Sequence, residues 1–109
     1  MARTEIPITS FTRAGTVMPA AIAGDTANGH ALPNDGATGL IVANNSADTA
    51  HSVTINLSRT VDGQSVVPRI ESVPAGESHA FGPFPPTDYG NSVAIDVDST
   101  ELTLNAVRV

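Results

Sequence analysis

The stretch VPAGESHAFGPFPPTDYG, which begins at Val73, constrains the fold more strongly than any other part of the sequence. Each of its prolines removes a backbone hydrogen-bond donor and fixes the φ angle. A helix therefore cannot run through the stretch, and any strand in it is short or lies at a sheet edge. A second stretch rich in turn-forming residues, NGHALPNDG, covers residues 28–36. Together the two stretches predict a small all-β module.

The spacing of apolar residues between turns supports this prediction. Alternating segments recur about every eight to twelve residues, as in a sandwich or barrel. The clearest segment is 51–59, in which Val53, Ile55 and Leu57 alternate with polar residues. About seven strands predict a single β-sandwich, either immunoglobulin-like or jelly-roll, with an extended N-terminal arm. The other predicted strand segments are 39–44, 59–61, 65–67, 69–73, 78–81, 92–98 and 102–109.

Two of these segments carry more specific predictions. Asp62-Gly63 joins two short apolar segments, and this dipeptide suits the type I′ turn of a two-residue hairpin. In the last segment the phase of the apolar residues breaks, because Leu102 and Leu104 lie on one face and Val107 and Val109 on the other. A β-bulge or a strand buried on both faces would explain the break.

Composition limits the possible functions. The 109 residues fit one domain, and the four aromatic residues are so few that the core must be largely aliphatic. Eleven acidic residues against five scattered arginines and no lysine give a net charge of −6. Binding to nucleic acids or to anionic membranes needs a concentrated positive surface, so we expect neither. The chain has no cysteine and no apolar signal segment, which predicts synthesis in a cytoplasm without disulfides.

The N-terminal region differs from the rest of the chain. Its apolar residues are too irregularly spaced for an amphipathic helix, although 16–27 has the composition for one helical turn. Residues 1–19 are either a first strand followed by a long surface loop or an arm that lies on a neighbouring subunit, and residues 20–109 form the sandwich. Long loops without structure are unusual in a compact domain unless they serve binding.

Three groups of residues were weighed as chemical sites. Gly76-Glu77-Ser78-His79-Ala80 is one residue short of the hydrolase motif Gly-x-Ser-x-Gly, but it leads into a strand and not into the helix that this motif requires. Asp96, Asp98 and Glu101 gather carboxylates at a strand end, without the glycine and ligand spacing of a calcium loop. The three histidines, which we expect to be structural, lack partners at metal-ligand spacing. We therefore predict no catalytic residue, no metal site and no cofactor. The histidines are His30, His51 and His79.

Five short motifs give the chain a resemblance to a known family. They are Asn28-Gly29-His30, Pro33-Asn34-Asp35-Gly36, Thr60-Val61-Asp62-Gly63, Val73-Pro74-Ala75-Gly76 and Gly82-Pro83-Phe84-Pro85-Pro86. The pattern, from about Thr16 to Val109, resembles small virion proteins encoded close to the major capsid gene in tailed phages of actinobacteria. The resemblance implies a structural protein of the virion, most simply a capsid decoration protein on the outer surface of the head, with the major capsid protein as its partner. A head-to-tail or tail component and a carbohydrate-binding sandwich stay open as alternatives.

Assembly is the last expectation. Closed symmetric oligomers are the general rule, and we expect a homo-oligomer, with a trimer favoured. The N-terminal arm carries the residues that we expect to contact the capsid or a neighbouring subunit, with Phe11 in an apolar pocket. These contact residues are Arg3, Ile6, Ile8, Phe11 and Arg13.

Overall fold

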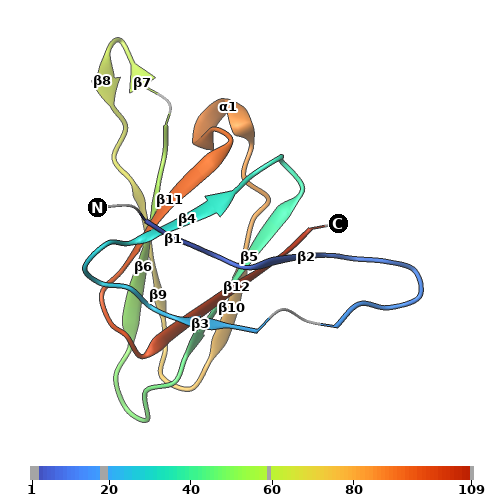
Figure 1. Cartoon of the computed structure of the whole chain (residues 1–109). Helices are drawn as coiled ribbons and strands as arrows, with labels where there is room; N and C mark the ends of the chain where they lie inside the picture. Colours follow the sequence, from blue (N-terminus) through green and yellow to red (C-terminus); the bar gives the residue numbers. More distant parts are fainter. Residues whose placement is uncertain (1–2, 18–19, 59, 109) are drawn as a thin grey trace.

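The computed structural model describes residues 3–17, 20–58 and 60–108, and it shows an all-β sandwich with a single helical turn (Figure 1). The strands of the first half are β1 (Thr4–Glu5), β2 (Ile8–Ser10), β3 (Ile22–Ala23), β4 (His30–Pro33), β5 (Thr38–Asn44) and β6 (His51–Asn56). Those of the second half are β7 (Thr60–Val61), β8 (Gln64–Ser65), β9 (Arg69–Val73), β10 (Ser78–Phe81), β11 (Ser92–Val97) and β12 (Leu102–Arg108). The predicted all-β class is confirmed.

Two packed sheets form the sandwich. Sheet A has the order β1-β4-β11-β6-β9, and sheet B has the order β10-β5-β12-β2, with β3 also pairing with β12. The pairs β1–β4 and β2–β12 are parallel, and the other pairs within the two sheets are antiparallel. Consecutive strands from β4 to β6, and again from β9 to β12, alternate between the sheets. The alternation is interrupted between β6 and β9, which are neighbours in sheet A.

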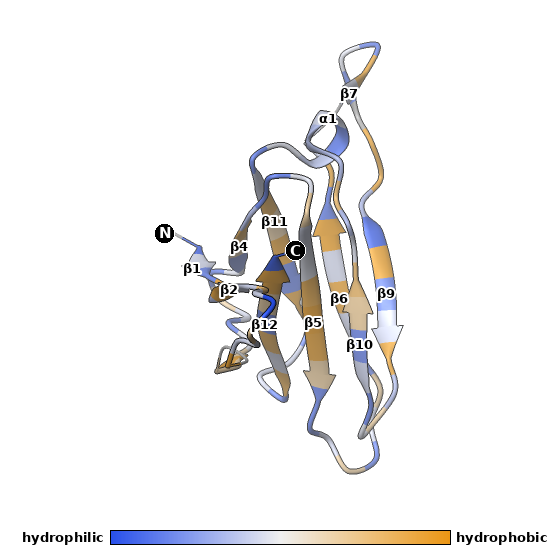
Figure 2. Ribbon diagram, turned by 90° about the vertical axis from the view of Figure 1, so that its right-hand side faces the viewer, coloured by the Kyte–Doolittle hydropathy of each residue, from blue (hydrophilic) through white to orange (hydrophobic). Residues whose placement is uncertain are grey.

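The core lies between the two sheets and is aliphatic, as the composition predicted. Strands β5, β11 and β12 bury every second residue, which is the period expected for a strand with one face inward. In β6, Val53 and Ile55 are fully buried, but Leu57 is only half-buried because the strand ends at Asn56. Hydrophobic colouring runs along much of β5 and β12 in Figure 2. Phe84 is the buried aromatic residue of the core, and the ring of Tyr89 packs edge-on against it at 5.2 Å.

Over its described residues, Leu102–Arg108, the C-terminal strand contains no bulge. β12 pairs with β5 in unbroken register from Leu102 opposite Asn44 to Arg108 opposite Thr38. The inward position after Leu104 is filled by Ala106, and Val107 lies half-buried on the outer face. The phase break therefore reflects an alanine at a core position. Val109 lies outside the described residues.

The hairpin prediction is confirmed. Strands β7 and β8 pair around Asp62 and Gly63, whose φ angles are +53° and +74°. Positive φ at both central residues is the type I′ conformation. This hairpin projects beyond the end of the two sheets in Figure 1.

Two local predictions differ from the structure. The expected helical turn in 16–27 is absent from the described residues of that range, where Ile22 and Ala23 form β3 against β12. A helical turn, α1, occurs instead at Pro86–Tyr89, where the fixed φ of Pro86 suits the first turn of a helix. Among the described residues, no helix is long and apolar enough to span a membrane.

Candidate interaction surfaces

The outer face of sheet B is the first candidate surface, because its central strands carry no charge there. In β5, β10 and β12 the inward positions alternate with outward ones, and the register aligns the outward residues across the sheet. The outward residues are Gly39, Ile41, Ala43, Ser78, Ala80, Thr103, Asn105 and Val107. These side chains leave the face uncharged, and Gly39, Ala80 and Val107 line a hollow of about 390 Å³ at one end of it.

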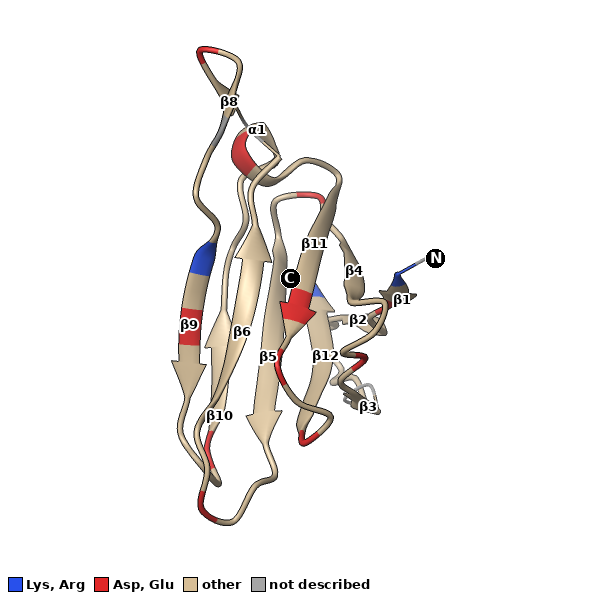
Figure 3. Cartoon of the chain, turned by 90° about the vertical axis from the view of Figure 1, so that its left-hand side faces the viewer, with Lys and Arg blue, Asp and Glu red and all other residues tan. Residues whose placement is uncertain are grey.

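Acidic residues lie elsewhere on the molecule. Of the eleven, only Glu5, Glu71 and Asp96 are in strands, and the other eight lie in connections or in α1. Figure 3 shows them mostly at the two ends of the sandwich, apart from bands on β9 and β11. The acidic charge is therefore concentrated away from the outer face of sheet B.

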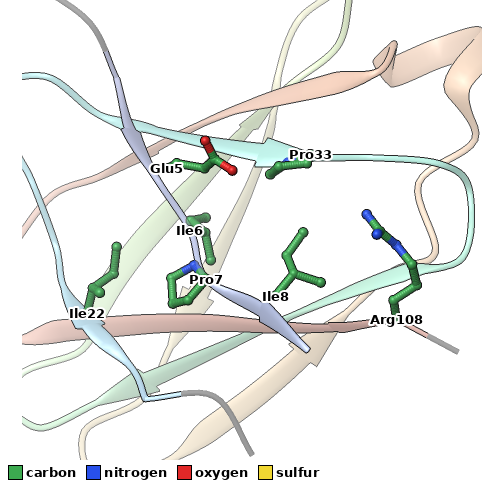
Figure 4. Close-up of a pocket in the computed structure, with 7 residues that line it drawn as sticks. All are labelled: Glu5, Ile6, Pro7, Ile8, Ile22, Pro33 and Arg108. Atoms are coloured by element: carbon green, nitrogen blue, oxygen red, sulfur yellow. The ribbon is translucent and has the colours of Figure 1, made fainter. Parts of the chain in front are cut away.

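A groove of about 500 Å³ lies where residues 4–10 cross from the edge of sheet A to the edge of sheet B. We call it the isoleucine groove. In Figure 4, Ile6, Pro7 and Ile8 lie in its middle, Ile22 and Arg108 lie on opposite sides of them, and Glu5 lies beside Pro33. The groove therefore has an apolar floor with one acidic and one basic side chain at its margin. Its lining residues are Glu5, Ile6, Pro7, Ile8, Ile22, Pro33 and Arg108.

The start of the chain is held on the sandwich by polar contacts. Arg3 pairs with Asp96 at 2.7 Å, and Asn56 donates a hydrogen bond to the same carboxylate at 3.0 Å. Burial alone would raise the pKa of Asp96, but the hydrogen bonds from Arg3 and Asn56 outweigh it and hold the pKa below 3.8. The hydroxyl of Thr4 donates to the Asp25 carboxylate at 2.8 Å. These contacts fix β1 against the edge of β4.

His30 organises the turn before β4. The side chain is 0% exposed, and its Nε2 accepts a hydrogen bond from the Asp25 backbone at 2.8 Å. The proton of the neutral ring then lies on Nδ1, which has no hydrogen-bond partner among the described residues. Burial lowers the pKa of His30 below 6.5. The neutral ring thus serves as a buried acceptor.

Asp25 completes this turn from the outside. Its carboxylate accepts hydrogen bonds from the backbone of Asn28 and Ala27 and from the Thr4 hydroxyl. The hydrogen bond from the Asn28 backbone is the largest of the effects that lower the pKa of Asp25 to about 2. Sequence reasoning did not single out Asp25. Its bonds from the Ala27 and Asn28 backbone are local and of the kind an Asp makes in a turn, but its contact with Thr4 spans 21 residues and leaves no local pattern.

The five residues expected to make contacts with a partner fall in different environments. Arg3 is ion-paired within its own chain. Ile6 is 1% exposed and belongs to the core of its own chain, whereas Ile8 is half-buried in the isoleucine groove. Phe11 is 54% exposed, and Arg13 is exposed in the loop that follows β2. Phe11 and Arg13 are therefore the members of the set most accessible to a partner.

The carboxylates weighed as a calcium site do not converge. Asp96 faces Arg3, whereas Asp98 and Glu101 flank His51, at 3.3 Å from Nδ1 and 3.1 Å from Nε2. Within residues 3–17, 20–58 and 60–108, no three His, Cys, Asp or Glu side chains are placed to hold a metal ion. The three carboxylates thus contact His51 and Arg3 of the same chain.

The segment weighed as a hydrolase motif forms a turn and then β10. Gly76 has a φ of +75° in the turn, and Ser78 and His79 follow as consecutive residues of the strand. His79 contacts Glu77 at 3.0 Å. The strand context that argued against the motif is confirmed.

A second groove, of about 470 Å³, lies between the edge strands β9 and β10. Arg69 and Glu71 share the inner side of β9 with Val73 and pair at 2.9 Å. Hydrogen bonds to Glu71 and Tyr89 raise the pKa of Arg69. Inward-pointing charges are a known means of preventing edge-to-edge pairing of sheets. Sequence reasoning missed this pair because the position of β9 at an edge has no local signal.

Comparison with known proteins found no family model, no curated protein and no solved structure that matches the chain.

Proposed function

We propose that the protein is a structural protein of a phage virion, a decoration protein that binds the outer surface of the capsid through the outer face of sheet B. The observation that carries the proposal is the distribution of charge. A protein with a net charge of −6 keeps a broad face of its sandwich free of charged side chains. Such a face loses little hydration when it meets another protein.

The rest of the molecule supports this role. A decoration protein must be soluble before assembly, and acidic turns at both ends of the sandwich provide this by mutual repulsion between free copies. It also needs a rigid body without a cofactor, which a sandwich with an aliphatic core supplies. The resemblance to small virion proteins of actinobacterial phages points to the same role.

The carbohydrate-binding alternative receives less support. Sugar-binding sandwiches usually present exposed aromatic rings, since the apolar face of a sugar stacks on them. Here Phe84 is buried, Phe81 and Tyr89 are partly buried, and only Phe11 of the four aromatic residues is exposed. A single exposed ring on a loop does not make a stacking platform.

The experiment is to measure the composition of purified phage particles that encode this chain. Quantitative mass spectrometry should find the protein in the particles at a copy number comparable to that of the major capsid protein. A copy number typical of one ring of subunits would favour the head-to-tail or tail alternative. Absence from washed particles would contradict the proposal.

A further inference from the structure

We propose that copies of this protein associate by inserting the loop after β2 of one copy into the isoleucine groove of another. We call this segment, residues 11–17, the arm loop. The inference concerns the free protein and does not rest on the proposed capsid role. It uses two features that the fold leaves unexplained, an exposed aromatic residue and an open apolar groove.

The arm loop presents its side chains outward from a defined turn. The backbone N–H of Phe11 donates to the Arg108 carbonyl at 2.7 Å, which fixes the start of the loop at the end of β12. The Gly15 N–H donates to the Thr12 carbonyl at 3.1 Å, and the Thr12 hydroxyl donates to the Gly15 carbonyl at 2.8 Å. Figure 1 shows the loop running out from the body of the sandwich. Phe11 is therefore displayed on an ordered loop at little further entropic cost.

The isoleucine groove offers a matching surface. Three isoleucines and two prolines line it, and Ile8 and Ile22 are only partly buried. An aromatic ring on a projecting loop is the typical anchor for an apolar pocket of this kind. Within one copy the groove and the arm loop lie next to each other, because Arg108 lines the groove and its backbone carbonyl accepts the hydrogen bond from the Phe11 N–H.

Charge favours a second copy as the occupant. Of the four arginines that the structure describes, Arg13 is the one without an ion pair, because Arg3, Arg69 and Arg108 pair with Asp96, Glu71 and Asp35. The carboxylate of Glu5, at the margin of the groove, makes no ion pair with a described residue. Arg13 lies two residues beyond Phe11, so a copy that places Phe11 in the groove carries a cation towards Glu5. One chain thus supplies both halves of a complementary contact.

Because each copy has one loop and one groove, the contact engages every loop if the rotation between copies closes into a symmetric ring, and otherwise it propagates as an open filament. The mass of the assembly then reports its order, and a trimer would match the expectation from the sequence.

The test measures self-association of the purified protein by analytical ultracentrifugation. Wild-type protein should form a discrete oligomer in equilibrium with monomer. Phe11→Ala should raise the dissociation constant by about tenfold or more. Val67→Ala, which also truncates an exposed apolar side chain but on the other side of the molecule, should leave it unchanged. Wild-type protein that stays monomeric at every soluble concentration, or equal effects of the two substitutions, would overturn the inference.

Charge reversal gives an independent readout. Arg13→Glu and Glu5→Arg should each weaken association by about fivefold, and the double variant should recover most of the loss. Both side chains are exposed, so thermal unfolding of all three variants should match wild type. A double variant as weak as the single ones would overturn the contact between Arg13 and Glu5. If the free protein is monomeric and Phe11→Ala instead weakens binding to capsid shells, the arm loop contacts a capsid protein and the second-copy assignment is wrong.

Discussion

At the scale of single residues, the neutral His30 makes stability depend on pH. Burial holds its pKa below 6.5, whereas the same histidine in the unfolded chain binds a proton at its ordinary value. As the pH falls below about 6.5, the unfolded chain gains a proton that the folded chain does not, so the free energy of unfolding decreases until the folded pKa is reached.

We expect this loss to have a slope of up to about 1.4 kcal/mol per pH unit. Urea unfolding measured from pH 7.5 downwards tests it. His30→Gln keeps an acceptor for the Asp25 backbone and does not titrate, so its slope should be shallower, while the control His79→Gln should retain the slope. The contribution of Asp25 to the free energy of unfolding is lost in a separate pH range, as the pH falls below 3.8 towards about 2. Identical slopes in wild type and His30→Gln would show that His30 is not responsible.

Gly29 supports a second prediction at this scale. Its φ is +73°, and a Cβ added there would collide with the Asp96 carboxylate and the Arg3 guanidinium. Gly29→Ala should therefore destabilise the protein by about 1–3 kcal/mol, through backbone strain and displacement of that ion pair. Gly63→Ala is the matched control, because its φ is +74° but no atom lies within 4 Å of the added Cβ. Chemical denaturation compares the two. If both substitutions lower the free energy of unfolding equally, backbone strain alone explains the loss. The close packing of Arg3 and Asp96 against Gly29 would then contribute nothing.

At the scale of elements, residues 4–10 form part of the sandwich by joining both sheets. β1 pairs with β4, β2 pairs with β12, and Ile6 lies in the core between them. Ile6→Ala should cost about 2–5 kcal/mol, because it leaves a cavity in a fully packed site. Phe11→Ala is the control and should leave the unfolding free energy almost unchanged, since that ring is exposed.

Deletion of residues 2–14 extends this prediction to the whole element. It should destabilise or unfold the free protein, as judged by the cooperativity of thermal unfolding followed by circular dichroism. A deletion variant that unfolds at the wild-type temperature would mean that the segment is a detachable arm.

The strands of the core were predictable because their signal is local. Alternation at Val53 and Ile55 marks one strand, and Asp62-Gly63 specifies a hairpin whose geometry only such dipeptides adopt readily. The isoleucine groove was not predictable, since Ile22 and Arg108 meet there from positions far apart in the chain. The helical turn expected in 16–27 is absent from the described residues of that range, because an isolated short helix is marginal, whereas pairing with β12 gives Ile22 and Ala23 inter-strand hydrogen bonds and leaves Ile22 partly buried.

At the scale of the whole molecule, we assign different tasks to different surfaces. In our proposals the acidic ends keep copies apart in solution, the edge with the arm loop joins copies, and the outer face of sheet B binds the capsid shell. Ala43 lies on that face in the central strand β5, and Thr54 lies on the outer face of sheet A in β6. Ala43→Glu and Thr54→Glu therefore place the same charge on opposite faces of one sandwich.

The most direct measurement is co-sedimentation of the purified protein with capsid shells that lack it, as a function of protein concentration. Wild type and Thr54→Glu should saturate the shells at the same fixed ratio to the major capsid protein. Ala43→Glu, with an unchanged unfolding temperature, should bind at least about tenfold more weakly, because its carboxylate would be desolvated without a partner. Wild-type protein that stays in the supernatant, or equal binding by the two glutamate variants, would contradict the account.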